Sequence, residues 1–190
     1  MSEQPRASRE TQTAGRPSPT IDAGVRIGHV HLKVSDLERA LAFYCGVLGF
    51  ELTQRYGKDA AFVSAGGYHH HIALNTWESR GGSPPPPGTT GLYHLAILYP
   101  TRAALADALR RLIAAGVPLE GASDHGVSEA LYLRDPDDNG VELYCDRAEE
   151  LWPRTPEGGL AMITRRLDVE GLLAEPPIGT AAEIEAPASR

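Results

Sequence analysis

A strand–helix–strands pattern that occurs twice is the feature that most constrains what this chain can fold into. Residues 26–34 (RIGHVHLKV) alternate apolar and polar side chains as a half-buried strand does, and a helical spacing of apolar residues follows them. Three short strand-like segments come next. After residues 78–91 (ESRGGSPPPPGTTG), which have the composition of a linker, a strand at 92–99, a helix and further strands follow in the same order. The sequence therefore predicts two modules, each with a helix covering one face of a small sheet, that pair to enclose a cavity.

Both predicted helices have recognisable ends. In the first module Ser35 and Glu38 form a capping-box pair, and Gly49 suits the position just after the last helical turn. In the second module Thr101 is placed to cap a helix that ends at Gly116.

The segments outside the modules differ from them in composition. The first 24 residues are rich in Ser, Thr, Pro and Arg with almost no large apolar side chains, so a disordered tail is expected there. Beyond residue 150 the chain becomes rich in Pro and Glu, with a short helix expected near 167–173. One domain, residues 25–150, is expected between these ends. The full division is a tail, module one, a linker, module two and a C-terminal extension, at residues 1–24, 25–77, 78–91, 92–150 and 151–190.

Composition argues against several classes of protein. Hydrophobic residues make up 42% of the 190, enough for a core, so wholesale disorder is not expected. The formal net charge of −7 is opposite in sign to that of a general nucleic-acid binder. No apolar run approaches the ~18 residues of a membrane span, and the first 20 residues lack the apolar segment of a secretory signal. With only two cysteines, Cys45 and Cys145, no disulfide framework is expected, and the default location is cytoplasmic.

Three polar side chains are predicted on sheet faces that point away from the helices. In each of three strands the apolar side chains must meet a helix, so the alternating polar positions face the other way. This places His29 in the first strand, His94 in the restarted strand and Glu142 in the last strand on the non-helix side. The two histidines also occupy matching positions, 65 residues apart. Taken singly, such residues are usually exposed or hydrogen-bonded, but two imidazoles and one carboxylate together suit Fe(II) or Mn(II).

Two stretches of the sequence resemble a known superfamily. GHVHLKVSDLERALAFYCGVLGFEL, which begins at Gly28, looks like the opening of a vicinal-oxygen-chelate module, the βαβββ unit of glyoxalases, fosfomycin-resistance proteins and extradiol dioxygenases. HGVSEALYLRDPDDNGVELY, which begins at His125, resembles the closing module of type I extradiol ring-cleaving dioxygenases, especially the catechol 2,3-dioxygenase branch. The resemblance extends over about residues 26–150. It implies an α+β fold of paired βαβββ modules that form a cradle around a metal site.

The resemblance implies a metal site on the residues that the face argument selected. Its ligands fall on His29, His94 and Glu142, and the cofactor implied is Fe(II), with Mn(II) as the alternative. Glyoxalases of this fold carry a fourth protein ligand, a glutamate on the last strand of the first module. That position falls on Ala73, whose side chain cannot bind a metal. The missing ligand leaves positions free for a bidentate substrate and O₂, which counts against a glyoxalase.

The resemblance also implies residues that handle protons and substrate. The family's acid–base histidine falls on His70, although strict strand alternation aims His69 and His71 inward instead. A second histidine and a tyrosine of the family fall on His125 and Tyr132. Three further residues are expected to contact substrate, namely His31, His71 and Tyr144.

The function that this resemblance implies is cleavage of a catechol-type ring with O₂ by an Fe(II)-dependent extradiol dioxygenase. The chain has room for one domain, so it resembles the single-domain members, and L-DOPA is the specific substrate expected. Two alternatives stay open: a metal-dependent isomerase, lyase or thiol transferase of the same superfamily, and a metal-free small-molecule binding protein. No nucleic-acid or membrane partner is expected and a homo-oligomer is allowed. The two modules around the site can belong to one chain or to two.

Overall fold

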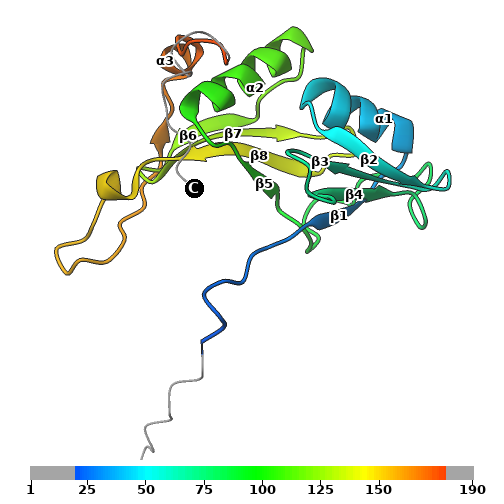
Figure 1. Cartoon of the computed structure of the whole chain (residues 1–190), viewed down its shortest axis with the longest axis horizontal. Helices are drawn as coiled ribbons and strands as arrows, with labels where there is room; N and C mark the ends of the chain where they lie inside the picture. The colour runs from blue at the N-terminus through cyan, green and yellow to red at the C-terminus, as the bar shows by residue number, and fades with distance from the viewer. Residues whose placement is uncertain (1–19, 179–190) are drawn as a thin grey trace, which may run out of the picture.

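Two β-sheets lie side by side in the computed structural model, which describes residues 20–178 (Figure 1). Helices cover the same side of both sheets, α1 (Leu37–Leu41) over the first and α2 (Arg102–Ala114) over the second. Most of the predicted N-terminal tail, residues 1–19, lies outside the described residues, as do residues 179–190. The α+β class predicted from the sequence is confirmed.

The first module is a four-stranded sheet with one helical segment. Its strand order is β1-β4-β3-β2; β1 runs parallel to β4, and the other neighbours are antiparallel. After α1 the helix continues with π-helical geometry as η1 (Ala42–Val47). The strands are β1 (Val30–Lys33), β2 (Glu51–Tyr56), β3 (Ala60–Ser64) and β4 (Ile72–Asn75).

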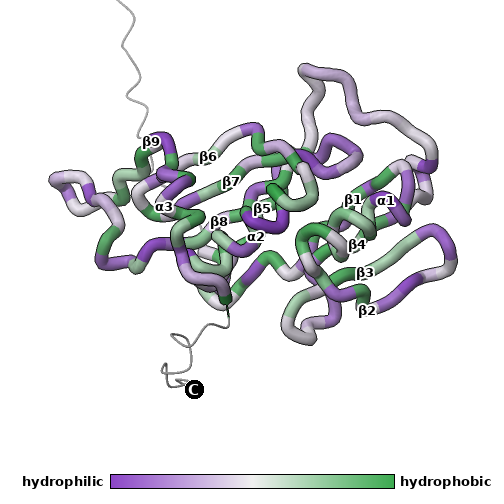
Figure 2. Tube along the Cα trace, turned by 90° about the horizontal axis from the view of Figure 1, so that it is seen from above, coloured by the Kyte–Doolittle hydropathy of each residue, from purple (hydrophilic) through white to green (hydrophobic). Residues whose placement is uncertain are grey.

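The second module repeats this topology. Its sheet has the order β5-β8-β7-β6-β9, with β5 parallel to β8 and the added strand β9 on the far side of β6. In Figures 1 and 2 the β5 edge of this sheet faces the β1 edge of the other. The strands are β5 (Leu95–Leu98), β6 (Gly121–Asp124), β7 (Ser128–Arg134), β8 (Gly140–Asp146) and β9 (Arg165–Arg166).

The C-terminal extension packs onto the second module. A 3₁₀ turn, η2 (Glu149–Leu151), leads to β9 and then to α3 (Val169–Leu173), which contacts α2. Leu167 and Leu172 are buried in the apolar core, with 3% and 0% of their surface exposed. The short helix predicted near 167–173 is therefore present, and the extension is an integral part of this half of the fold.

The start of α1 differs from the prediction. Asp36, and not Ser35, is the N-cap, because its Oδ1 accepts the Arg39 backbone N–H at 3.0 Å. Ser35 Oγ instead accepts from the Arg39 side chain at 2.7 Å, and Glu38 pairs with Arg55 rather than with the helix end. A carboxylate at the cap satisfies a free N–H and also interacts favourably with the helix dipole.

The other predicted helix ends are observed. Thr101 Oγ1 accepts the Ala104 backbone N–H at 3.1 Å at the start of α2. Gly49 and Gly116 follow the two helices with φ angles of +88° and +67°. Glycine adopts this left-handed backbone at little cost, which explains the choice of residue at both ends.

One apolar core extends beneath the helices of both modules, and polar contacts join the modules at its edge. The fully buried Tyr44 in η1 donates its hydroxyl hydrogen to Asp135 Oδ2 at 2.9 Å. Nearby, Arg39 of α1 pairs with Asp137 at 2.6 Å. Both aspartates lie in the β7–β8 turn, where Asp135 also accepts hydrogen bonds from within the turn. These contacts fix the helix of module one against the sheet of module two.

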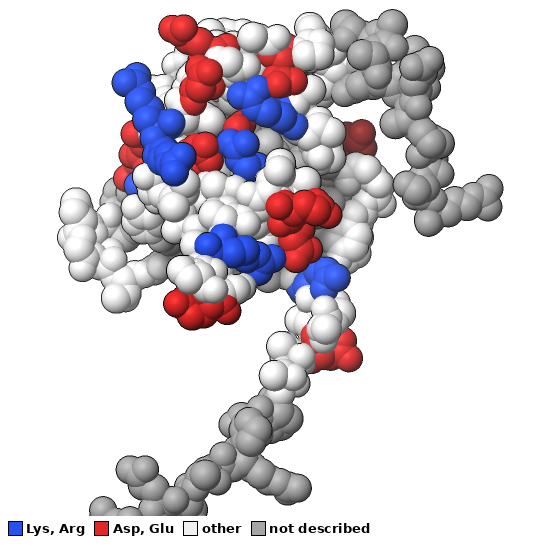
Figure 3. All heavy atoms as spheres, turned by 90° about the vertical axis from the view of Figure 1, so that its left-hand side faces the viewer, with Lys and Arg blue, Asp and Glu red and all other residues white. Residues whose placement is uncertain are grey.

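The surface carries charges of both signs. On the face shown in Figure 3, Lys and Arg side chains are interspersed with Asp and Glu side chains. That face therefore has no single-signed field of the kind that attracts nucleic acid. Between residues 20 and 178, no helix has the length and apolar character needed to cross a membrane.

Candidate metal and catalytic site

A histidine and a carboxylate meet where β5 and β8 run parallel. His94 immediately precedes β5, and the register pairs Ala96 of β5 with Glu142 of β8. The His94 Nε2 atom lies 2.9 Å from Glu142 Oε2. The Glu142 side chain is only 13% exposed, whereas that of His94 is 31% exposed. The parallel pairing thus brings together two of the three predicted metal ligands.

A chain of polar contacts extends from Glu142 across the sheet. Tyr132 lies directly opposite Glu142 in the antiparallel β7–β8 pair, and its hydroxyl donates to Glu142 Oε1 at 3.1 Å. His125 Nε2 lies 2.7 Å from the same hydroxyl oxygen. Burial, together with the negative charge of Glu142, raises the pKa of Tyr132 to about 12, so its hydroxyl is protonated at neutral pH. The structure therefore places Tyr132 and His125 beside the predicted ligand Glu142.

The second ring nitrogen of His125 is bound by the C-terminal extension. His125 Nδ1 lies 3.0 Å from the backbone carbonyl oxygen of Ile163 and 3.3 Å from Thr164 Oγ1. Neither residue was singled out in the sequence. A main-chain carbonyl leaves no signature in residue type, and these positions lie 38 and 39 residues beyond the histidine.

The histidines of module one are held by ring contacts. The His29 and His70 ring centroids are 4.4 Å apart, and His70 also lies 5.0 Å from Phe62. Phe62 pairs with Ala73 across the sheet, so its side chain is on the face away from α1. Partial burial, and then the neighbouring His29, lower the pKa of His70, so its ring is neutral at neutral pH.

The three consecutive histidines lie just before β4. β4 begins only at Ile72, and residues 69–71 are not in a regular strand. His71 Nδ1 lies 3.0 Å from Ser64 Oγ, and Ser64 is two residues from Phe62 on β3, so this contact agrees with the side that alternation gives His71. His69 Nδ1 contacts His70 Nδ1 at 2.7 Å. His70 is the one of the three whose ring contacts His29.

Two further residues predicted to contact substrate, His31 and Tyr144, lie on the sheet faces that point away from the helices. His31 pairs with Ala73 in the β1–β4 register, and its ring packs 5.4 Å from that of Trp77. Burial, followed by the effect of His29, lowers the pKa of His31. Tyr144 lies two residues beyond Glu142 on β8 and so points to the same side of its sheet.

Equivalent positions of the two modules differ in the residue that can bind a metal. The parallel register aligns Ala96 with Glu142 in module two, and it aligns His31 with Ala73 in module one. Glu142 and Ala73 therefore occupy corresponding places in the two sheets, and Ala73 is 99% buried, with 1% exposed. A carboxylate is available on this strand only in module two.

The third predicted ligand is not part of the His94–Glu142 contact. Among the described residues, no three His, Cys, Asp or Glu side chains are close enough together to hold a metal ion. His29 precedes β1 in the other module, and its ring packs against His70. The donor types fit a divalent ion. The His94 imidazole and the Glu142 carboxylate already meet, and a second imidazole, His29, directly precedes β1, the edge strand that faces β5.

A cavity opens beside the polar chain. Its volume is about 360 Å³, within the range of small-molecule sites. It is lined by Tyr93, His94, Glu120, Gly121, Tyr132, Leu133, Arg134, Gly140 and Val141. The cavity therefore reaches both His94 and Tyr132.

Comparison with known proteins assigns the family. Residues 26–143 match the glyoxalase, bleomycin resistance protein and dioxygenase superfamily. The chain belongs to this superfamily. A glyoxalase/dioxygenase from Nostoc punctiforme has the same fold, with a TM-score of 0.57 and 19% identity over 68% of this chain and 98% of that one.

Curated relatives within the superfamily are dioxygenases. A catechol-2,3-dioxygenase of Bacillus subtilis is 43% identical over 157 residues, which are 82% of this chain and 54% of the relative. A biphenyl-2,3-diol 1,2-dioxygenase of Rhodococcus globerulus is 36% identical over 64% of this chain and 63% of its own length. This chain thus spans about half to two thirds of the length of these relatives.

Proposed function

We propose that this protein is an extradiol ring-cleaving dioxygenase that acts on a catechol-type substrate with O₂. The observation that carries the proposal is the chain of polar contacts from Glu142 through Tyr132 to His125, which lies beside His94 and a cavity. The names of the curated relatives support the same reaction class. The absence of a carboxylate at Ala73 counts against the four-ligand glyoxalase alternative.

The metal proposed is Fe(II), held by His29, His94 and Glu142, with Mn(II) as the alternative. When bound, Fe(II) would supply a Lewis-acid centre that takes up catecholate charge and accommodates O₂ beside the substrate. The ligand atoms of His94 and Glu142 lie 2.9 Å apart and would take adjacent positions on one ion, and His29, whose ring packs against His70, would turn toward the same ion. His70 would then be free to face the substrate.

The proton-handling residues have distinct tasks in this proposal. His70, whose lowered pKa keeps it neutral, would take the proton that a catechol hydroxyl loses on binding and later return it to the product. Tyr132 would donate a hydrogen bond to a substrate oxygen, since its raised pKa keeps the hydroxyl protonated. His125, in contact with Tyr132, would exchange a proton with that hydroxyl.

The substrate proposed is a catechol that carries an amino-acid side chain, with L-DOPA as the specific compound. The cavity of about 360 Å³ has room for one substituted ring. His31 and Tyr144 lie on the faces that flank the ligands, and His71 lies at the end of the same surface, so these three residues would contact the substituents.

The test is a direct assay of the reaction. The purified protein is loaded anaerobically with Fe(II), or with Mn(II) in parallel, and mixed with catechol or L-DOPA in air-saturated buffer. A yellow semialdehyde product with matching O₂ uptake is expected. Glu142→Gln is expected to abolish both signals, whereas the matched change Glu78→Gln, at a 78% exposed side chain, is not.

Two outcomes contradict the proposal in different ways. Tight binding of one Fe(II) without colour or O₂ uptake from any catechol would favour an isomerase, lyase or thiol transferase of the superfamily. Failure to bind either metal at stoichiometric amounts would favour a metal-free binding protein.

A further inference from the structure

Ile163 of the C-terminal extension binds His125 through two different bonds, and its carbonyl is closer to His125 Nδ1 than the neighbouring Thr164 Oγ1 is, at 3.0 Å against 3.3 Å. The Ile163 backbone N–H donates to the His125 carbonyl oxygen at 3.1 Å, and the Ile163 carbonyl oxygen lies 3.0 Å from His125 Nδ1. On the other side, the His125 backbone N–H donates to the Ser128 carbonyl at 2.9 Å. Both the main chain and the ring of His125 are therefore oriented by neighbours.

The partner on Nδ1 determines where the ring carries its hydrogen. A carbonyl oxygen can only accept a hydrogen bond, so Nδ1 must be the donor in this contact. In a neutral imidazole the other nitrogen then has no hydrogen and is an acceptor. His125 Nε2, 2.7 Å from the Tyr132 hydroxyl oxygen, is then an acceptor for the hydroxyl hydrogen and competes for it with Glu142 Oε1 at 3.1 Å, because the hydroxyl carries only one hydrogen. In water, neutral histidine prefers the opposite tautomer, so the protein must impose this one.

The segment that carries Ile163 is firmly attached to the second module. We call residues 153–175 the C-terminal arm. Strand β9 of the arm pairs with β6, and Leu167 N–H donates to the Ala122 carbonyl at 3.3 Å. Arg110 of α2 donates through its guanidinium to the Leu173 and Glu175 carbonyls. The buried Leu172 adds an apolar anchor.

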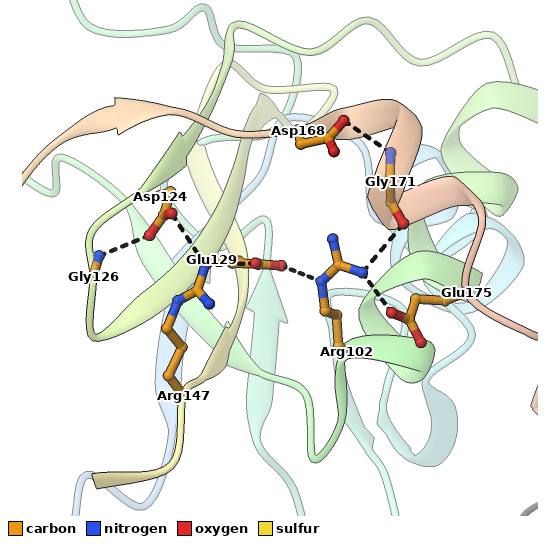
Figure 4. A network of polar contacts seen from close by, with 8 residues as sticks. All are labelled: Arg102, Asp124, Gly126, Glu129, Arg147, Asp168, Gly171 and Glu175. Atoms are coloured by element: carbon orange, nitrogen blue, oxygen red, sulfur yellow. Dashed lines mark hydrogen bonds and ion pairs between the residues drawn. The ribbon is translucent and has the colours of Figure 1, made fainter. Parts of the chain in front are cut away.

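A network of charges links the arm to the turn that carries His125 (Figure 4). Arg102 of α2 donates to the Gly171 carbonyl at 3.2 Å, pairs with Glu175 at 2.5 Å, and also pairs with the buried Glu129 at 2.6 Å. Glu129 in turn pairs with Arg147 at 2.7 Å. The same network continues into the turn itself at Asp124.

Within the turn, Asp124 and Gly126 complete the connection. Arg147 pairs with Asp124 at 3.0 Å, and Asp124 Oδ1 accepts the Gly126 N–H at 2.8 Å. Gly126 has a φ of +75°, and a Cβ there would come within 2.9 Å of Pro153 and 3.1 Å of Ile163. The arm and the turn therefore approach so closely that only glycine fits between them.

We propose that the C-terminal arm is a positioning element, in which the Ile163 carbonyl holds His125 as its Nδ1–H tautomer and aims Nε2 at Tyr132. The arm lies beyond residue 143, where the match to the superfamily ends. That the device serves turnover rests on the proposed function; the tautomer itself does not depend on it.

The first test reads the tautomer directly in the full chain. Long-range ¹H–¹⁵N correlation spectra of uniformly ¹⁵N-labelled, metal-free protein at pH 8 distinguish a ring nitrogen that carries hydrogen from one that does not. The His125 signals are assigned by their loss in His125→Gln. We expect hydrogen on Nδ1 and none on Nε2. Hydrogen on Nε2 in the unmodified protein would overturn the proposal.

The second test removes the support. Ile163→Pro eliminates the N–H bond to His125 and should displace the carbonyl, so the Nε2–H tautomer is expected to dominate. Ile163→Val keeps the main-chain bonds and is expected to retain Nδ1–H. If Ile163→Pro does not fold by circular dichroism, Arg110→Ala loosens the arm from α2 and is expected to raise the Nε2–H population. A folded Ile163→Pro or Arg110→Ala protein with unchanged His125 signals contradicts the proposal.

An activity measurement separates this inference from the proposed function. In the Fe(II)-loaded enzyme, Ile163→Pro is expected to lower kcat for catechol cleavage about tenfold or more and to shift the pH profile, because part of the acid–base contribution is lost. Ile163→Val keeps the main-chain bonds, so neither the loss of kcat nor the shift of the pH profile is expected in it. If no catechol is cleaved by the unmodified protein but the tautomer is Nδ1–H, the function is wrong and the positioning stands. If cleavage occurs and the tautomer is Nε2–H, the proposed function stands and the positioning role of the arm is wrong.

Discussion

The two modules have the same topology but hold their polar residues in different ways. In both, the first strand runs parallel to the last one and a helix covers one face. In module two, Glu142, Tyr132 and His125 form a continuous series of polar contacts. In module one, His29 and His70 are in contact through their rings, without a carboxylate between them. The common backbone therefore supports a polar array centred on a carboxylate in one half and a cluster of imidazoles in the other.

Two pairs of equivalent positions explain this difference. Glu142 in β8 corresponds to Ala73 in β4, so only module two has an acceptor that can organise a hydroxyl and an imidazole. Extending the same registers by one residue places Gly140 opposite His94, and His71 opposite His29. Glycine allows the β5 entry to approach β8 closely, because a Cβ at Gly140 would overlap the carbonyl oxygen that precedes His94. Repeating a fold thus leaves each half free to differ at single sites.

The largest effect is expected from removal of the carboxylate that distinguishes the modules. Glu142→Ala should reduce metal affinity by more than the ~100-fold that loss of an outer partner causes, and activity should disappear with the metal. Metal titration followed by measurement of bound iron checks this. Glu78→Ala, which removes an exposed carboxylate at the start of the linker, serves as the control. Retention of tight metal binding by Glu142→Ala would show that module two does not supply the carboxylate ligand.

The next effect is expected at His70, the imidazole of module one whose ring contacts His29. His70→Phe should reduce kcat about 10²–10⁴-fold, because an acid–base group is lost, while Fe(II) binding stays intact. Steady-state kinetics and iron content are measured on the same samples. Loss of bound iron in this variant would instead identify His70 as a ligand and contradict the role proposed for it.

A change at Gly140 tests the close approach of β5 and β8. Gly140→Ala should displace His94, since the new Cβ would meet the Tyr93 carbonyl and lie 3.0 Å from His94 Cβ. A shift of about 1 Å in a ligand is expected to lower activity about 10²-fold. Gly46→Ala is the matched control, because a Cβ at Gly46 meets nothing within 4 Å. Equal activities of the two variants would mean that the position of His94 does not depend on the close contact of Tyr93 and His94 with Gly140.

The smallest effect is expected where the two modules join. Tyr44→Phe removes the buried hydroxyl that donates to Asp135, with little change in packing. The free energy of unfolding should fall by about 1–3 kcal/mol, since a hydrogen bond to a charged acceptor is lost. Urea denaturation checks the stability, and a small change in activity would accompany it only if the contact also aligns the modules. An unchanged midpoint would show that Asp135 is satisfied within its own turn.

Much of the fold was accessible from local patterns. Alternation in residues 26–34 and the spacing of apolar residues predicted the first strand and helix, and Thr101 and Gly116 marked the ends of α2. The capping-box interpretation of Ser35 failed because a neighbouring aspartate competes for the same N–H. Alternation alone did not show which of residues 69–71 contacts His29, because these residues precede the regular strand β4.

By itself the sequence determined the repeated module, the faces of its strands and the kinds of donor available at the site, because these depend on residue type and on spacing along a single element. Only the tertiary structure decided that His94 meets Glu142, that His70 rather than His71 contacts His29, and that Ile163 supports His125. These contacts join segments far apart in the chain, and the last involves a backbone carbonyl that every residue possesses. Their formation depends on strand register and on the docking of the C-terminal arm, which no local pattern encodes.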